Sequence, residues 1–223
     1  MIKVYEENAV EIVSAPEGFV IVSQEENLED KAVVSFKFYS LRTHKLINVT
    51  RDVYLRAKFG ENYQKIHDVL DDYVNYSVAT LNDGRTVCVY PDSKAVMFSE
   101  TGETVWSGEF KYKDHTPTGI TFDGRNIWVA FGMADTILRY NMTSMRWDLR
   151  IGSMNDQAFS GPEGLLSIGS NLIVCNSASK CIEGVDIDKY SIEQLYTFDE
   201  PVYQVIKSEQ DTVVLLESGV YIL

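Results

Sequence analysis

The sequence predicts an all-β fold, because short apolar runs lie between turn residues, recur along the chain and accompany many aromatic residues. The run Ile127–Phe131 holds five apolar residues between the polar turn Asp123–Arg125 and a loop that begins at Gly132. A half-exposed strand would alternate apolar and polar residues, and an apolar helix would be longer. The run is therefore predicted to be a strand that is covered on both faces. The 13 Tyr and 10 Phe residues also favour strands.

The pattern recurs at a nearly constant period. Shifted by 45 residues, the Pro-x-Gly start at Pro117 aligns with the one at Pro162. The same shift aligns the run at Ile127 with the run at Leu172. Runs of this kind begin at positions 19, 87, 127, 172 and 213, so the last three gaps are 40, 45 and 41 residues. Repeats of this length are typical of propeller blades, and five runs predict five blades.

The clearest repeat divides into four short strands joined by turns. The predicted strands are Gly119–Phe122, Ile127–Phe131, Ile137–Tyr140 and Arg146–Ile151. The last strand is the most polar, as expected for the outer rim of a blade. The predicted fold class is therefore an all-β, five-bladed β-propeller with four-stranded antiparallel blades.

One propeller domain is expected over residues 1–223. Its blades are predicted at roughly 8–54, 73–113, 117–152, 162–199, and 201–223 plus 1–7. The last blade runs out after three strands, so the N-terminal strand Ile2–Glu6 is expected to complete it and close the ring.

The first gap between apolar runs, from position 19 to position 87, is 68 residues and exceeds the others. Within it, Phe59, Tyr63, Ile66 and Leu70 are spaced 4, 3 and 4 residues apart. That spacing places them on one face of a short helix, so a helical insertion is expected at 60–72.

The composition excludes several classes of partner. A formal net charge of −13 argues against nucleic acid, whose binding depends on Lys and Arg, and against an anionic membrane surface. No stretch approaches the ~20 apolar residues of a membrane-spanning helix. The first residues lack the basic and apolar regions of a signal peptide. The odd number of cysteines, Cys88, Cys175 and Cys181, fits a reduced, cytoplasmic protein.

The repeat resembles a known family of propeller repeats. Its Pro-x-Gly-Ile/Leu start, its turn and its apolar strand that ends in a polar loop are similar to the NHL and related β-propeller repeats. The resemblance is good in blades three and four, looser in blades two and five and weak in blade one. It implies the fold and no particular activity, because propellers host unrelated activities.

Ligand sites of propellers usually lie over the central channel, on the loops that join second to third strands and on the links between blades. The candidate ligand-binding residues there are Tyr90, Asp92, His115, Phe131, Asp135, Glu163, Asn176, Lys180 and Glu217, with Met133 on the same loops. Aromatic loop residues contribute binding energy at a low entropic cost. The favoured function is a non-catalytic module that binds a protein or a polar ligand, such as a glycan, at the channel mouth.

An enzyme is the alternative function. Thr118–Tyr140 is similar to plant-type glutaminyl cyclase, another five-bladed propeller, in its Gly-Ile-Thr, Asp-Gly and Trp-Val elements. The catalytic glutamate of that family lies in a Glu-Gly-Trp-Gly element just before this strand, where this chain has Asp114–Gly119, without glutamate or tryptophan. The lactonase propellers carry a carboxylate near the chain start and metal-binding Asn and Asp, roles that Glu17 and Asn176 would take here. The alternative is therefore a small cyclase or hydrolase of these kinds.

Metal and thiol chemistry are weakly indicated. The carboxylates Asp92, Asp135, Glu163 and Glu217 are weak calcium candidates, because oxygen ligands suit a hard cation. No other cofactor is expected. Cys175 and Cys181 are expected to be two small buried residues, with a disulfide or thiolate pair across a hairpin as the alternative.

Overall fold

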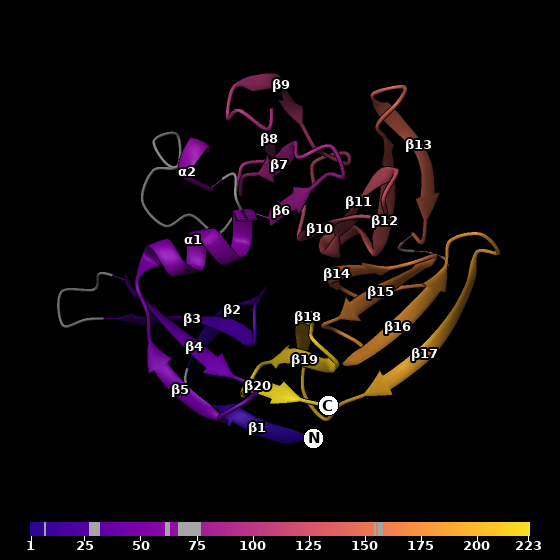
Figure 1. Ribbon diagram of the computed structural model, residues 1–223. Coiled ribbons are helices and arrows are strands. Elements are labelled where there is room, and N and C mark those ends of the chain that lie inside the picture. The colour runs from indigo at the N-terminus through magenta and orange to yellow at the C-terminus, as the bar shows by residue number, and fades with distance from the viewer. Residues whose placement is uncertain (7, 27–31, 61–62, 67–76, 154, 156–157) are drawn as a thin grey trace. The chain divides into compact units, whose positions relative to one another are not determined.

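The computed structural model describes all residues except 7, 27–31, 61–62, 67–76, 154 and 156–157. It is a five-bladed β-propeller of four-stranded antiparallel sheets, as predicted (Figure 1). Blade one is β2 (Ala9–Ala15), β3 (Gly18–Glu26), β4 (Ala32–Ser40) and β5 (Lys45–Asn48). Blade two is β6 (Ser77–Thr80), β7 (Thr86–Val89), β8 (Lys94–Phe98) and β9 (Thr104–Glu109). Blade three is β10 (Gly119–Phe122), β11 (Asn126–Phe131), β12 (Thr136–Asn141) and β13 (Arg146–Ile151).

The last two sheets complete the set. Blade four is β14 (Pro162–Ile168), β15 (Asn171–Asn176), β16 (Cys181–Asp186) and β17 (Ser191–Thr197). Blade five is β18 (Val202–Ser208), β19 (Asp211–Leu216), β20 (Gly219–Ile222) and β1 (Ile2–Tyr5). The chain divides into two compact units, unit one with Met1–Tyr63 and Tyr203–Leu223, and unit two with Gln64–Val202. The expectation of a single domain stays a prediction.

The N-terminal strand completes blade five, as predicted. Strand β1 pairs antiparallel with β20, and Tyr5 lies opposite Val220. The Tyr5 side chain is buried in the core of unit one, and its hydroxyl donates to Ser23 Oγ at 3.0 Å. Lys37 Nζ in turn donates to the Tyr5 hydroxyl at 2.9 Å. Strand β1 therefore contributes both an edge and a core side chain to the unit.

Strand β11 is buried along its whole length because it packs on both neighbouring blades. Ile127 and Val129 belong to an apolar cluster that includes Val87 of blade two. Trp128, which lies between them in sequence, belongs to a second cluster that includes Val174 of blade four. Successive side chains of a strand point to opposite faces, so each face of β11 fills a different interface. This arrangement explains the unbroken apolar run in the sequence.

Among the described residues, helices α1 and α2 follow blade one. Helix α1 spans Arg51–Phe59, before the predicted insertion, and α2 spans Tyr63–Ile66, within it. The rest of the predicted insertion, 67–72, lies outside the described residues. Among the residues that are described, no helix has the length and apolar character needed to cross a bilayer.

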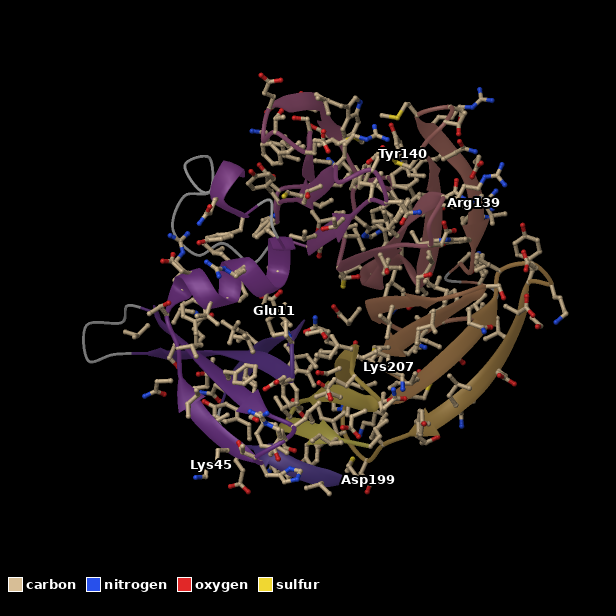
Figure 2. The ribbon with its side chains drawn as sticks, in the orientation of Figure 1. Glu11, Lys45, Arg139, Tyr140, Asp199 and Lys207 are labelled. Atoms are coloured by element: carbon tan, nitrogen blue, oxygen red, sulfur yellow. The ribbon has the colours of Figure 1, made fainter. Side chains whose placement is uncertain are left out.

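A buried polar cluster attaches α1 to blade one. Glu11 of β2 lies beside α1 (Figure 2). Lys58 Nζ donates to Glu11 Oε1 at 2.6 Å, and the Tyr54 hydroxyl donates to Glu11 Oε2 at 2.8 Å. Lys58 also donates to the Tyr54 hydroxyl at 2.9 Å. A buried carboxylate that has both a cation and a hydroxyl as partners is compensated for lost hydration. Sequence reasoning missed this cluster because Glu11 is 43 and 47 residues away from Tyr54 and Lys58.

Candidate functional site

Three loops of unit two hold four of the nine predicted ligand-binding residues, and Met133 as well. The three loops are residues 90–93, 132–135 and 177–180, and each joins the second strand of its blade to the third. We call these three loops together the loop end. Tyr90 and Asp92 follow β7, Met133 and Asp135 follow β11, and Lys180 precedes β16. The predicted Glu217 follows β19 and belongs to unit one.

Two predicted residues are buried beneath the loop end. Phe131 has no exposed surface and lies in the core of unit two. Asn176 is also fully buried, and its Oδ1 accepts from the backbone N–H of Ser160 at 3.2 Å. Its Nδ2 donates to Glu183 Oε2 at 3.0 Å. Both side chains thus support the loops from inside the blade.

Asp135 holds two blades together. Its backbone is left-handed, with φ of 48°, and it ends the short 3-10 turn Gly132–Ala134. Its Oδ1 accepts from the backbone N–H of Gly161 at 2.8 Å, just before β14. Thr118 Oγ1 makes a second link by donating to the carbonyl of Pro162 at 2.7 Å. These bonds fix the position of the loop that carries Met133.

Glu163 is a partly buried carboxyl on β14. Burial raises its pKa, and the hydroxyl of Ser177, which donates to Oε1 at 3.4 Å, opposes that rise. A carboxyl with a raised pKa is a recurrent feature of acid–base sites. Glu163 is therefore the predicted site residue that suits the enzyme alternative, and Glu183 on β16 is a second carboxyl whose pKa is raised by burial.

The remaining candidates are accessible. Met133 is 77% exposed, the highest value among the large apolar side chains that the structure describes. Asp92 is exposed, and its Oδ1 accepts from the backbone N–H of Lys94 at 3.0 Å. The Lys94 ammonium lies 5.6 Å from the centroid of the partly exposed Tyr90 ring. Lys180 Nζ donates to the carbonyl of Asp199 at 2.9 Å.

His115 lies between β9 and β10 on a short hairpin. Its backbone N–H donates to the carbonyl of Tyr112 at 3.0 Å. The Tyr112 ring lies 5.9 Å from that of Phe131, and its hydroxyl accepts from Arg150 at 2.9 Å. His115 is therefore placed near the loop end of blade three by the packing of its hairpin.

The two cysteines of blade four do not form a pair. Cys175 lies opposite Ile182 and Cys181 lies opposite Asn176, so the two thiols point to opposite faces of the sheet. Both are free and buried, and burial raises the pKa of each thiol. The structure thus agrees with two small buried residues and excludes the disulfide.

The described residues contain no group of three or more His, Cys, Asp or Glu side chains arranged to hold a metal ion. The weak calcium candidates are accordingly not gathered into such a group. Three of them, Asp92, Asp135 and Glu163, accept hydrogen bonds from the protein itself.

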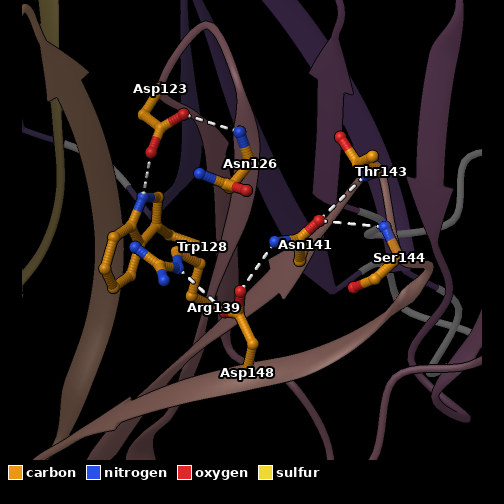
Figure 3. Close-up of polar contacts among 8 residues, drawn as sticks. All are labelled: Asp123, Asn126, Trp128, Arg139, Asn141, Thr143, Ser144 and Asp148. Carbon is orange, nitrogen blue, oxygen red and sulfur yellow. Dashed lines mark hydrogen bonds and ion pairs between the residues drawn. The ribbon is translucent and has the colours of Figure 1, made fainter.

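At the opposite end of blade three, Asp123 organises a turn that the sequence marks only as Asp-Gly. Its Oδ2 accepts from Trp128 Nε1 at 2.7 Å, and its Oδ1 accepts from the backbone N–H of Asn126 at 2.6 Å (Figure 3). Trp128 is fully buried, so the carboxylate satisfies its indole N–H. An aspartate five residues before a tryptophan is the signal that would have revealed this bond.

A second set of hydrogen bonds stabilises the outer hairpin of blade three, which β12 and β13 form. Arg139 Nε donates to Asp148 Oδ1 at 2.8 Å, and Asn141 Nδ2 donates to Asp148 Oδ2 at 2.7 Å (Figure 3). Asn141 Oδ1 accepts the backbone N–H groups of Thr143 and Ser144. These contacts hold the pKa of Asp148 below its ordinary value, chiefly through the bond from Arg139. The network stabilises the blade at the end away from the candidate site.

The chain matches no family model and no curated protein. Among solved structures it is similar to the computationally designed Ika4 protein, with a TM-score of 0.51 and 11% identity over 69% of this chain and 92% of that chain. U3-55K and the RRP9 WD40 repeats each align with 93% of this chain, with TM-scores of 0.54 and 0.53 and identities of 8% and 9%. This chain covers 58% and 57% of those two chains, less than two thirds of their length. Likeness at such low identity shows the propeller fold alone.

Proposed function

We propose that this chain is a non-catalytic binding module that contacts a protein or a polar ligand, such as a glycan, through the loop end of unit two. The observation that carries the proposal is Met133, a large apolar side chain that is 77% exposed. Methionine is flexible and polarisable, which suits it to binding surfaces that adapt to a partner. Burial of this side chain against a ligand would recover hydrophobic free energy.

The loop that carries Met133 is held by hydrogen bonds, so little entropy is lost when it binds. Gly132 N–H donates to Thr118 Oγ1 at 3.2 Å, on one side of the methionine. Asp135 accepts from the Gly161 N–H at 2.8 Å, on the other side. Loops that are already ordered bind with a smaller conformational cost.

The neighbouring loops supply groups of mixed chemistry. Tyr90 and His115 offer aromatic surfaces, and Asp92 and Lys180 offer charges of opposite sign. An apolar anchor with polar groups around it suits a folded protein or a polar ligand better than a purely apolar molecule.

Selection of ligands with matched variants tests this proposal. A random peptide library and a glycan array are screened with the wild-type protein, and each binder is then measured against Met133→Ser. We expect the affinity to fall about tenfold, as for a residue that anchors an interface. Val105→Ser on β9 is the control, because Val105 is also apolar and 52% exposed. Failure of both libraries, or equal losses in the two variants, would contradict the proposal.

The second candidate is an enzyme of the glutaminyl cyclase or lactonase kind, favoured by Glu163. Its raised pKa suits a general acid, and the Ser177 hydroxyl lies 3.4 Å from its Oε1. Cyclisation of a peptide with N-terminal glutamine and hydrolysis of simple lactones are the assays. Turnover that is lost in Glu163→Gln would support the enzyme, and the absence of turnover in the wild type would remove it.

We further propose that the blades are NHL-like repeats and that the protein is cytoplasmic. The Pro-x-Gly starts at Pro117 and Pro162 support the NHL-like repeat. Three free, buried cysteines support a reducing compartment.

A further inference from the structure

We propose that β17 is a second binding site, which accepts an extended peptide with alternating apolar and basic residues as an added strand. Its regularly paired part lies at the end of β17 away from the loop end, because Ser191 pairs with Asp186 and Thr197 pairs with Cys181, directly after the loop 177–180. Strand β17 is the outermost strand of blade four, and all seven of its residues are exposed. Its inner edge pairs with β16, and no described strand pairs with its outer edge (Figure 1). An outer edge of this kind presents backbone N–H and C=O groups to an incoming strand.

Three of the four other outer strands carry features that discourage pairing, and the fourth, β9, is one residue shorter than β17 and only partly exposed. Strands β1 and β5 have only four residues each. Strand β13 carries the charged residues Arg146, Asp148 and Arg150 among its six. Strand β17 is longer than all three and carries only one charged residue, Glu193. Short strands and charged side chains are the usual protections of a sheet edge, and β17 largely lacks both.

The backbone of β17 is regular enough to receive a strand. Ser191, Ile192, Glu193 and Gln194 pair one to one with β16. The register shifts after Gln194, and the side chain of Leu195 lies over Gly184. The regular segment Ser191–Gln194 is therefore the part of the edge where an added strand would pair.

Large apolar side chains are exposed along this edge. Ile192, Leu195 and Tyr196 are 37%, 38% and 46% exposed, and Tyr190 just before the strand is 52% exposed. Ile168 is 42% exposed, and its turn lies beside the turn before β17, because Ile187 N–H donates to Ser170 O at 3.0 Å. Ile192 offers an apolar contact on one face of an added strand, and Leu195 and Tyr196 offer contacts on the other face, which they share with Glu193.

The charge around the edge selects a basic partner. Asp188 and Glu193 are exposed acidic residues beside and within β17. Lys189, the cation of this segment, is paired with Asp186 at 2.8 Å. A second copy of the chain is disfavoured, because pairing of two β17 edges would bring their acidic residues together on molecules of net charge −13. A peptide with Lys or Arg between its apolar residues complements both features.

The probe is a short fluorescent peptide of alternating lysine and valine, titrated into the full chain at physiological salt. Ile192→Lys should weaken binding about tenfold, and Val105→Lys on β9, with the same added charge, should leave it within about twofold. Methylation of every second backbone amide of the peptide should abolish binding, because it removes the strand hydrogen bonds and keeps the side chains. Hydrogen exchange of Ser191–Gln194 should slow when the unmodified peptide binds.

Several results would overturn the site. One is that the peptide does not bind, and another is that the methylated peptide binds equally well, since the attraction would then be electrostatic alone. Equal losses in Ile192→Lys and Val105→Lys would have the same meaning. If the free protein forms a dimer and Ile192→Lys dissociates it, the edge binds a second copy of the chain instead of a peptide. Met133→Ser should not change this binding, so the two proposed sites can fail separately.

Discussion

Replacement of Tyr5 by alanine tests how strongly the N-terminal strand stabilises the protein. The Tyr5 side chain is 6% exposed and packs in a cluster with Ile12, Phe19 and Val220. Removal of a buried aromatic side chain typically costs about 3–5 kcal/mol, because transfer free energy is lost and a cavity remains. We therefore expect the free energy of unfolding to fall by about that amount.

Tyr5→Phe separates the hydroxyl from the ring. The hydroxyl donates to Ser23 at 3.0 Å and accepts from Lys37 at 2.9 Å. Ser23 is buried but keeps a contact with Ser35 Oγ at 2.7 Å. The loss in Tyr5→Phe should therefore be about 1–2 kcal/mol, smaller than the loss in Tyr5→Ala.

Urea unfolding followed by circular dichroism measures both losses. Ile2→Ala is the control, because Ile2 lies on the same strand and is 67% exposed. If Tyr5→Ala unfolds within about 1 kcal/mol of Ile2→Ala, the burial of Tyr5 and the packing of β1 are wrong.

Three further substitutions have defined outcomes in the same assay. Gly219→Ala should cost about 1–3 kcal/mol, because φ is +138° and the added Cβ would collide with the carbonyl oxygen of Tyr5. Asp123→Ala should cost about 2–3 kcal/mol, because it leaves the buried indole N–H of Trp128 without its acceptor. Burial raises the pKa of Glu163 above that of the unfolded chain. The stability that Glu163 contributes is therefore complete below about pH 4 and is lost as the pH rises through the folded pKa, so Glu163→Gln should gain stability relative to wild type between acidic and neutral pH.

Each substitution has a matched control. Gly169→Ala shares a positive φ, +59°, but its Cβ would meet nothing within 4 Å. Asp114→Ala removes an exposed aspartate from the same unit, and Glu109→Gln removes an exposed glutamate. If Gly169→Ala costs as much stability as Gly219→Ala, or Asp114→Ala as much as Asp123→Ala, the named contacts are not the cause. The same holds for Glu163 if Glu109→Gln changes the pH dependence of stability in the same way as Glu163→Gln.

The fold was predictable because its signal is local and repeated. The apolar run at Ile127 differs from an alternating strand because β11 packs on two blades. Burial on both faces requires five consecutive apolar residues, and the sequence shows them directly. The completion of blade five by β1 followed from a count of strands. The register of β1 against β20 did not follow, because the two strands lie at opposite ends of the chain.

The candidate site was predictable only as a set of loops. Sequence placed Phe131 and Asn176 on those loops, but their burial depends on packing between blades, which has no local signal. The position of the Met133 loop likewise depends on the bonds that Asp135 and Thr118 make across blades. The exposed edge of β17 could not be separated from an ordinary outer strand until its neighbours were placed.

Hydrogen exchange tests the proposed binding function most directly. The protein is compared alone and in complex with a peptide or glycan that the library screens select. Binding at the loop end should slow exchange in residues 132–135 and in at least one of the loops 90–93 and 177–180. Slowed exchange confined to the outer strands β9, β13 and β17, with the three loops unchanged, would contradict a ligand site at the loop end.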